Sequence, residues 1–304
     1  MRTYSMLLSA ALLAAPAAGR AAGTTAAPFL RQEPTARVTG MGGAAAALYD
    51  DAGAAYFNPA GLGFMRGNRA AFAVWNGVDE KSREAFASMI FNSGGLGGFG
   101  ITYLRHSSGK EDIYDLGGNL SSVELAEDYA LGAGWGFEVS SNLALGAQAK
   151  FVSSRLAETY NAKAATFDAG VLFKTDNGRF TAGGGFQNAG GELKYVSEGD
   201  PLPRLLYGGA AMRFPVGGGK LLLAADLHQP RDEARADTHA GLEYSVGLLA
   251  LRLGARNVSG DGGMTAGGGI KVKWFVFDYG FQASGALDQP VHQFAFSLIF
   301  GGAD

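Results

Sequence analysis

Two short motifs pair a histidine with an aspartate two residues away: Asp226 with His228, and Asp237 with His239. Imidazole nitrogens and carboxylate oxygens are ligands for zinc, so the four side chains could bind a metal if their strands lie side by side. The same residues could instead form paired charges inside a sheet, which is the simpler interpretation. We favour paired charges and expect no metal or other cofactor.

The motifs of common hydrolases are missing from the chain. It contains no G-x-S-x-G and no H-E-x-x-H sequence, and it has only 4 histidines. The glycine strings at 183–185 and 267–269 resemble nucleotide-binding loops but lack the lysine and the following helix of a P-loop. With no cysteine, thiol chemistry and disulfides are excluded. We expect that the protein is not an enzyme.

Composition points away from an ordinary soluble domain. Only 17% of the 304 residues are charged and 48 are glycine, whereas typical domains carry about 25% charged residues and about 7% glycine. The net charge of -3 and the scattered lysines and arginines provide no basic surface for nucleic acid. A nucleic-acid partner is therefore not expected.

The first residues have the pattern of a secretory signal peptide. Arg2 precedes an apolar stretch, Met6 to Ala15, and small residues follow as far as Gly23. We expect residues 1–22 to be this signal. Ten apolar residues are too few for a transmembrane helix, which needs about 20, and no longer apolar run follows. If the exported chain lies in a membrane, it must cross as β-strands.

From Arg69 onward, apolar and polar residues alternate with a period of two. Leu249, Leu251 and Leu253 alternate with Arg252 and Gly254, as expected of strands with two different faces. The pattern predicts strands at 69–77, 83–92, 96–106, 128–138, 142–154, 164–174, 179–187, 204–214, 219–228, 236–246, 248–257, 263–273, 275–284 and 292–300.

Tight turns and long polar loops alternate between these strands. Turns such as 139–141 and 175–178 are short, whereas 107–127, 155–163 and 188–203 are long. Bacterial outer-membrane barrels show this asymmetry, with the short turns facing the periplasm. Lipid leaves unpaired backbone groups unsatisfied, so the sheet must close. Residues 68–300 are thus predicted to form an all-β, antiparallel transmembrane barrel of about 14 strands in the bacterial outer membrane, with lipid and the barrel assembly machinery as partners. Near strand ends, Trp75, Trp135 and Trp274 are candidates for an interfacial girdle.

The polar faces of the strands would then point into the lumen. The candidate lumen-facing residues are Lys150, Asp168, Asp226, His228, Asp237, His239, Glu243, Arg252, Arg256 and Asp278. Because both signs of charge are present, these residues either brace a plugged interior or line a polar permeation path. Several inward positions are glycine, including Gly146, Gly170 and Gly183, which would leave room for a plug.

Residues 36–65, before the first predicted strand, do not follow the strand pattern. One or two helical turns are expected at 44–49 and a second short helix at 52–57, capped by Asp50 and Asp51 and ended by Asn58-Pro59. Gly40, Gly42 and Gly43 permit tight turns before these helices. The many small residues suit a segment packed within another structure.

The run GMGGAAAALYDDAGAAYFNPAGLG, residues 40–63, resembles the N-terminal signature of the PorV/PorQ proteins, which belong with the FadL-like long-chain fatty-acid transporters. The segment 277–300, FDYGFQASGALDQPVHQFAFSLIF, is similar to that family's closing hairpin. The resemblance implies a fourteen-stranded barrel in which residues 23–67 form a hatch inside the lumen. The hatch motif, which includes the Asn-Pro-Ala signature, consists of Gly40, Gly42, Gly43, Asp50, Asp51, Asn58, Pro59, Ala60 and Gly61.

Two functions follow from this resemblance. The first is transport or binding of a hydrophobic small molecule, released through the hatch or sideways through a gap in the wall; Gly94, Gly95, Gly97 and Gly98 mark the candidate gap, with a tight glycine turn as the alternative. The second is a partner barrel of a type IX-like secretion system that engages secreted cargo through loops 107–127 and 188–203.

Overall fold

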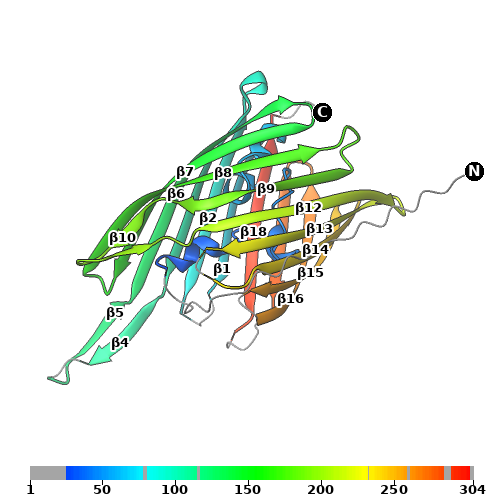
Figure 1. Ribbon diagram of the computed structural model, residues 1–304. Helices are drawn as coiled ribbons and strands as arrows, with labels where there is room; N and C mark the ends of the chain where they lie inside the picture. Colours follow the sequence, from blue (N-terminus) through cyan, green and yellow to red (C-terminus); the bar gives the residue numbers. More distant parts are fainter. Residues whose placement is uncertain are drawn as a thin grey trace, which may run out of the picture.

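The computed structural model describes residues 25–77, 81–114, 117–231, 233–258, 261–283 and 289–301. Fourteen antiparallel strands form a closed barrel, in the order β1-β18-β17-β16-β15-β14-β13-β12-β9-β8-β7-β6-β3-β2 (Figure 1). The first and last strands close it, with Asn68 opposite Phe300 and Trp75 opposite Gln293. The expected fold class is confirmed. The expected signal, residues 1–22, lies outside the described residues.

The barrel strands match the predicted ones to within a few residues at each end. They are β1 (Asn68–Asn76), β2 (Arg83–Asn92), β3 (Gly98–Ser107), β6 (Ala126–Ser140), β7 (Leu143–Leu156), β8 (Tyr160–Lys174), β9 (Phe180–Ala189), β12 (Leu205–Val216), β13 (Gly219–Pro230), β14 (Asp237–Val246), β15 (Leu249–Val258), β16 (Asp261–Val272), β17 (Phe275–Gln282) and β18 (Val291–Phe300). The alternation of apolar and polar residues predicts the strands correctly because the outer and inner faces of each strand have different surroundings.

Three of the expected long loops are organised differently. The segment 155–163 is not a loop: β7 and β8 continue pairing as far as Leu156 and Tyr160, and Ala157 and Glu158 make the turn with positive φ. The residues are polar because these strands extend past the membrane into water, and their polarity therefore does not indicate a loop. The loop 107–127 contains the hairpin β4 (Lys110–Tyr114) and β5 (Leu120–Glu124), which projects beyond the barrel, and the loop 188–203 contains β10 (Glu192–Lys194) and β11 (Gly199–Pro201) (Figure 1).

The two faces of the wall differ sharply in polarity. On β15, Leu249, Leu251 and Leu253 point outward and are 55%, 67% and 59% exposed, while Arg252 between them is 5% exposed and points inward. The other strands show the same arrangement, so the outer surface is apolar where lipid would contact it. Trp135 and Trp274 lie on this outer surface, whereas Trp75 is 7% exposed, which removes it from the expected girdle.

Residues 25–67 fold inside the barrel as the hatch. Its elements are η1 (Pro28–Arg31), α1 (Ala36–Gly40), α2 (Ala54–Phe57) and α3 (Gly61–Phe64). The helix predicted at 52–57 is confirmed over Ala54–Phe57, and Asn58 ends it. No helix forms at 44–49, because tight packing against the wall and the side chain of Asp226, which accepts two backbone hydrogen bonds there, hold this stretch in turns. Within the described residues, no helix is long and apolar enough to span a membrane.

Candidate functional site

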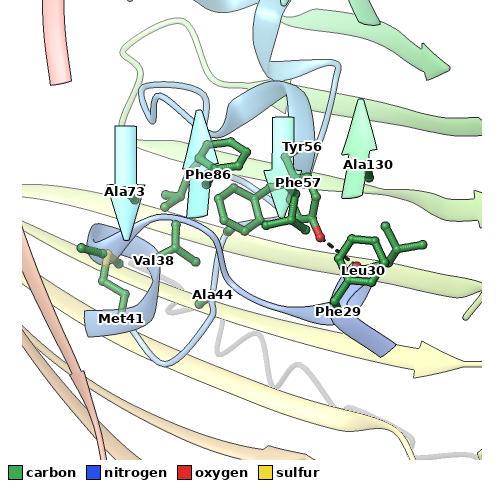
Figure 2. Close-up of a cluster of buried hydrophobic side chains, with 14 of the residues drawn as sticks. Phe29, Leu30, Val38, Met41, Ala44, Tyr56, Phe57, Ala73, Phe86 and Ala130 are labelled. Carbon is green, nitrogen blue, oxygen red and sulfur yellow. Dashed lines mark hydrogen bonds between the residues drawn. The ribbon is translucent and has the colours of Figure 1, made fainter. Parts of the chain in front are cut away.

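The hatch is held in the lumen by a continuous apolar contact with the wall. Val38, Tyr56 and Phe57 of the hatch pack toward Ala73 and Phe86 of strands β1 and β2 (Figure 2). All five side chains are at most 9% exposed. The hydroxyl of Tyr56 donates to the carbonyl of Leu30 at 2.8 Å, which ties α2 to η1 within the hatch (Figure 2).

Asn58 joins the hatch to itself and to the wall. It is fully buried, and its Nδ2 donates to the carbonyl of Ala46 at 2.8 Å and to that of Val171 in β8 at 3.2 Å. Its Oδ1 accepts from the backbone N–H of Ala60 at 3.1 Å. The Asn-Pro-Ala segment thus needs an asparagine, because the amide must donate and accept at the same time.

Glycines in the wall make room for this segment. A Cβ on Gly146 would lie 2.3 Å from the carbonyl carbon of Pro59, and one on Gly170 would lie 2.0 Å from Oδ1 of Asn58. Both separations are far below van der Waals contact. The inward glycines therefore let the hatch backbone approach the strands.

The glycine turn that follows α1 is fixed in a similar way. Gly42 has a φ of +68°, and a Cβ there would lie 2.6 Å from the carbonyl oxygen of Ala240. Thr265 accepts from the N–H of Gly42 at 2.9 Å and donates to the carbonyl of Gly40 at 3.2 Å. Nδ1 of His239 donates to the carbonyl of Gly42 at 2.7 Å. The turn is therefore bound on both sides.

A chain of buried charges fastens α1 to the wall. Arg37 makes two hydrogen bonds of 2.8 Å to the carboxylate of Glu243 in β14. Arg252 donates to the same carboxylate at 2.7 Å and to Asp278 at 2.7 Å. This Arg37–Glu243–Arg252–Asp278 chain, here called the latch, pairs two guanidiniums with two carboxylates across the hatch boundary.

The adjacent carboxyls of Asp50 and Asp51 behave differently beside the latch. Burial raises the pKa of Asp50, but Arg37, whose Nη1 lies 3.1 Å from Oδ1, and Arg213 outweigh burial and hold that pKa well below its ordinary value. For Asp51 burial dominates and raises the pKa, since Arg37 is 4.0 Å away. Oδ1 of Asp51 accepts from the N–H of Gly53 at 2.7 Å, in the turn before α2. The predicted capping by Asp50 and Asp51 is wrong, because Gly53 is the N-cap of α2 and no side chain caps this helix.

The remaining candidate lumen residues also lie on the inner side of the wall, and most of them contact the hatch or one another. The contacts are Asp226 with the N–H groups of Ala45 and Ala46, Arg256 with Glu33, Asp237 with Arg31, and Lys150 with Asp168. His228 lies against His239, with ring centroids 4.4 Å apart. Among the described residues, no group of three or more histidine or carboxylate side chains is arranged to hold a metal ion.

Two of the cavities beside the hatch lie toward opposite rims of the barrel. The turn-side cavity has a volume of about 480 Å³. Its charged lining residues are Arg37, Asp50, Asp51, Arg69, Lys220, Glu243, Arg252, Lys271 and Asp278. The loop-side cavity has a volume of about 440 Å³. It is lined by Ala27, Pro28, Phe29, Gln32, Ser82, Glu84, His106, Ala126, Asp128, Ser154, Leu156 and Tyr195.

A polar row in the loop-side cavity was missed by the sequence analysis. Strand register places Glu84 opposite His106, His106 opposite Asp128, and Asp128 opposite Ser154, so the four residues cross β2, β3, β6 and β7 at one level. In the structure Glu84, Asp128 and Ser154 are at most 6% exposed, on the inner side of the wall. Placing them at one level required the register, because the intervals between successive members, 22, 22 and 26 residues, depend on the lengths of the turns and loops between the strands.

The proposed lateral gap is not found at its expected place. Gly94–Leu96 forms a 3₁₀ turn, η2, and Gly97 follows with a φ of +88°. Gly98 is paired on both sides, with Asn92 in β2 and with Gly136 in β6. The wall is continuous here, so the alternative of a tight glycine turn describes these residues.

No protein-family model matches the chain, and no curated protein matches it. Solved structures are similar to it. They include the CymD monoaromatic hydrocarbon channel (TM-score 0.58, 13% identity, covering 87% of this chain and 97% of that chain). The Pseudomonas putida toluene transporter TodX has a TM-score of 0.54 at 14% identity, covering 86% and 95%. A Pseudomonas aeruginosa FadL homologue has a TM-score of 0.55 at 11% identity, covering 88% and 98%. At these identities the likeness concerns the fold.

A closed fourteen-stranded sheet with an apolar outer face and a charged interior is the architecture of bacterial outer-membrane barrels, and it fixes the location. The protein is a bacterial outer-membrane β-barrel. The tight-turn rim of such barrels faces the periplasm, so the loop-side cavity faces the outside of the cell.

Proposed function

We propose that this barrel takes up a small hydrophobic molecule from outside the cell, holds it in the loop-side cavity and passes it across the membrane. The observation that carries the proposal is the loop-side cavity itself. Its volume of about 440 Å³ lies within the range of roughly 300–1,000 Å³ found for small-molecule sites. Apolar groups of Phe29, Leu156 and Tyr195 line it beside the polar row.

The hatch supports a transport role because it separates the two cavities. A molecule in the loop-side cavity reaches the periplasm only if the hatch shifts or the wall opens. The neighbours CymD and TodX are described as a hydrocarbon channel and a toluene transporter, which makes monoaromatic compounds suitable first probes. The resemblance of residues 40–63 to the PorV/PorQ signature favours membership of that group within the FadL-like proteins.

Uptake of labelled ethylbenzene by a Gram-negative host that lacks its own hydrocarbon channel tests the proposal. Expression of the barrel should raise uptake, and Ala126→Trp should reduce it because the indole would fill the loop-side cavity. Ala133→Trp is the matched control, since Ala133 lies on the outer face of the same strand. Equal uptake by the Ala126→Trp variant and the unmodified barrel would contradict the proposal.

A second candidate function is engagement of a secreted protein. It is favoured by the projecting β4–β5 hairpin, on which Ile113, Tyr114 and Leu120 are 44%, 72% and 57% exposed. Deletion of residues 110–124 separates the two functions. Unchanged ethylbenzene uptake is expected under the first. Failure of a protein to reach the medium of the source cell after this deletion would support the second.

A further inference from the structure

The carboxylate of Glu84 in the loop-side cavity is held by one of its two oxygens. Oε1 accepts from Nε2 of Gln32 at 3.0 Å and lies 2.6 Å from Nδ1 of His106. Oε2 has no hydrogen-bond donor in the described part of the protein, although Glu84 is only 3% exposed. The side chain is thus fixed in place with one buried acceptor left over.

Two more buried oxygens in the same cavity also lack a hydrogen-bond donor among the described residues. Oδ1 of Asp128, a residue that is 6% exposed, and Oε1 of Gln32 are buried and receive no hydrogen bond from the described residues. Both residues line the loop-side cavity with Glu84. Buried acceptors without a donor are unfavourable, so three of them on one cavity indicate a ligand that donates.

The charge of the cavity identifies the kind of donor. The described lining residues include two carboxylates, Glu84 and Asp128, and no lysine or arginine. His106 is the one basic side chain among them, so even with a protonated imidazole the described lining carries a net negative charge. A cationic donor therefore gains both hydrogen bonds and charge attraction.

We propose that the loop-side cavity binds hydrophobic amines, with the ammonium group at Glu84 and Asp128 and the apolar body along Phe29 and Leu156. A primary ammonium carries three N–H donors, as many as the unfilled acceptors of Gln32, Glu84 and Asp128. This assignment rests on the proposed function and names its substrate class.

Calorimetry on the full-length, refolded barrel in detergent tests the assignment with three probes of one shape. They are 2-phenylethylamine, the neutral ethylbenzene and the anionic 3-phenylpropionate. The variants are Glu84→Gln, Asp128→Asn and the double variant. Glu138→Gln is the matched control, because that carboxylate is paired with Arg66 at the opposite rim. Heat-modifiable migration in gels verifies that each variant is folded.

The amine should bind the unmodified barrel at least about tenfold more tightly than ethylbenzene, and 3-phenylpropionate should bind most weakly. Each single variant should remove most of this preference and the double variant all of it, while ethylbenzene affinity stays within about twofold. Glu138→Gln should match the unmodified barrel.

Equal affinities for the amine and ethylbenzene would overturn the amine assignment and leave the proposed function standing. An amine preference that survives the double variant would likewise overturn it. Displacement of the amine by micromolar Ca²⁺ would reassign the carboxylates to a metal cation. Absence of binding by all three probes would overturn both the assignment and the proposed function.

Discussion

The two cavities beside the hatch are similar in size, about 440 and 480 Å³, but differ in how their charges are matched. In the turn-side cavity, Glu243 and Asp278 are each paired with an arginine. In the loop-side cavity, Glu84 and Asp128 each have one oxygen that receives no hydrogen bond from the residues the structure describes. The paired charges of the latch fasten the hatch to the wall. The acceptors of Glu84 and Asp128 that have no donor among the described residues are the basis of the proposed ligand site. The comparison therefore assigns fastening to the turn side and binding to the loop side.

Breaking the latch should give the largest effect. Arg37→Gln removes a guanidinium from Glu243 and leaves a buried carboxylate with one partner fewer, a change that typically costs about 3–5 kcal/mol. We expect a lower urea midpoint for unfolding and new conducting events in planar bilayers, as the hatch loosens. Arg66→Gln, which breaks an exposed pair with Glu138, should cost less than about 1 kcal/mol. Equal effects of the two substitutions would refute the latch.

Crowding the hatch against the wall should have the next largest effect. Gly146→Ala places a methyl group 2.3 Å from Pro59, and the forced shift should destabilise the barrel by about 1–3 kcal/mol in urea unfolding. Gly208→Ala is the control, because the nearest atom to its Cβ is 3.8 Å away. If Gly146→Ala were as stable as Gly208→Ala, the hatch would not contact the wall as described.

Asp50 and Asp51, both in the turn-side cavity, should contribute differently to the pH dependence of the barrel's stability. The pKa of Asp50 is depressed in the folded state, so its stabilising contribution is present at neutral pH and is lost as pH falls below the ordinary value of about 3.9 toward the depressed one. The pKa of Asp51 is raised, so ionisation of Asp51 opposes folding as pH rises above that ordinary value.

Urea midpoints at neutral and acidic pH test this difference. Asp50→Asn should lower the midpoint at neutral pH, with a loss of less than about 1 kcal/mol in the free energy of unfolding, because the residue is partly exposed. Asp51→Asn should leave the midpoint unchanged or raise it. The two variants should converge in acid, and a larger loss for Asp51→Asn at neutral pH would reverse the assignment.

The smallest effect is expected at the glycine turn 94–98, the predicted site of the lateral gap. Gly95 has open space around its Cβ position, so Gly95→Ala should change the free energy of unfolding by no more than about 0.5 kcal/mol. Ethylbenzene uptake should be unchanged. A marked fall in uptake by the folded variant would restore the lateral route at this turn.

The sequence was most informative where the surroundings impose a simple pattern. Lipid outside and polar groups inside force a period of two, so the strands were placed to within a few residues. No such period constrains the hatch, and the helix expected at 44–49 is replaced by turns that Asp226 stabilises from 180 residues away. The candidate residues of the latch were identified singly, but their pairing depends on contacts across the hatch boundary.

The polar row of the loop-side cavity shows the same limit. Glu84, His106 and Asp128 lie near strand ends, where the alternation of the sequence gives way to polar residues that also suit a loop. Their common level follows from strand register, and their unmatched oxygens follow from the positions of Gln32 and Tyr195 on other segments. Neither property is local in sequence.

A crystal structure of the barrel soaked with ethylbenzene tests the central claim most directly. The account predicts density for one aromatic ring between Phe29 and Leu156 in the loop-side cavity, with the hatch in place beneath it. Density confined to the turn-side cavity or to the outer face, with the loop-side cavity free of the probe, would contradict it.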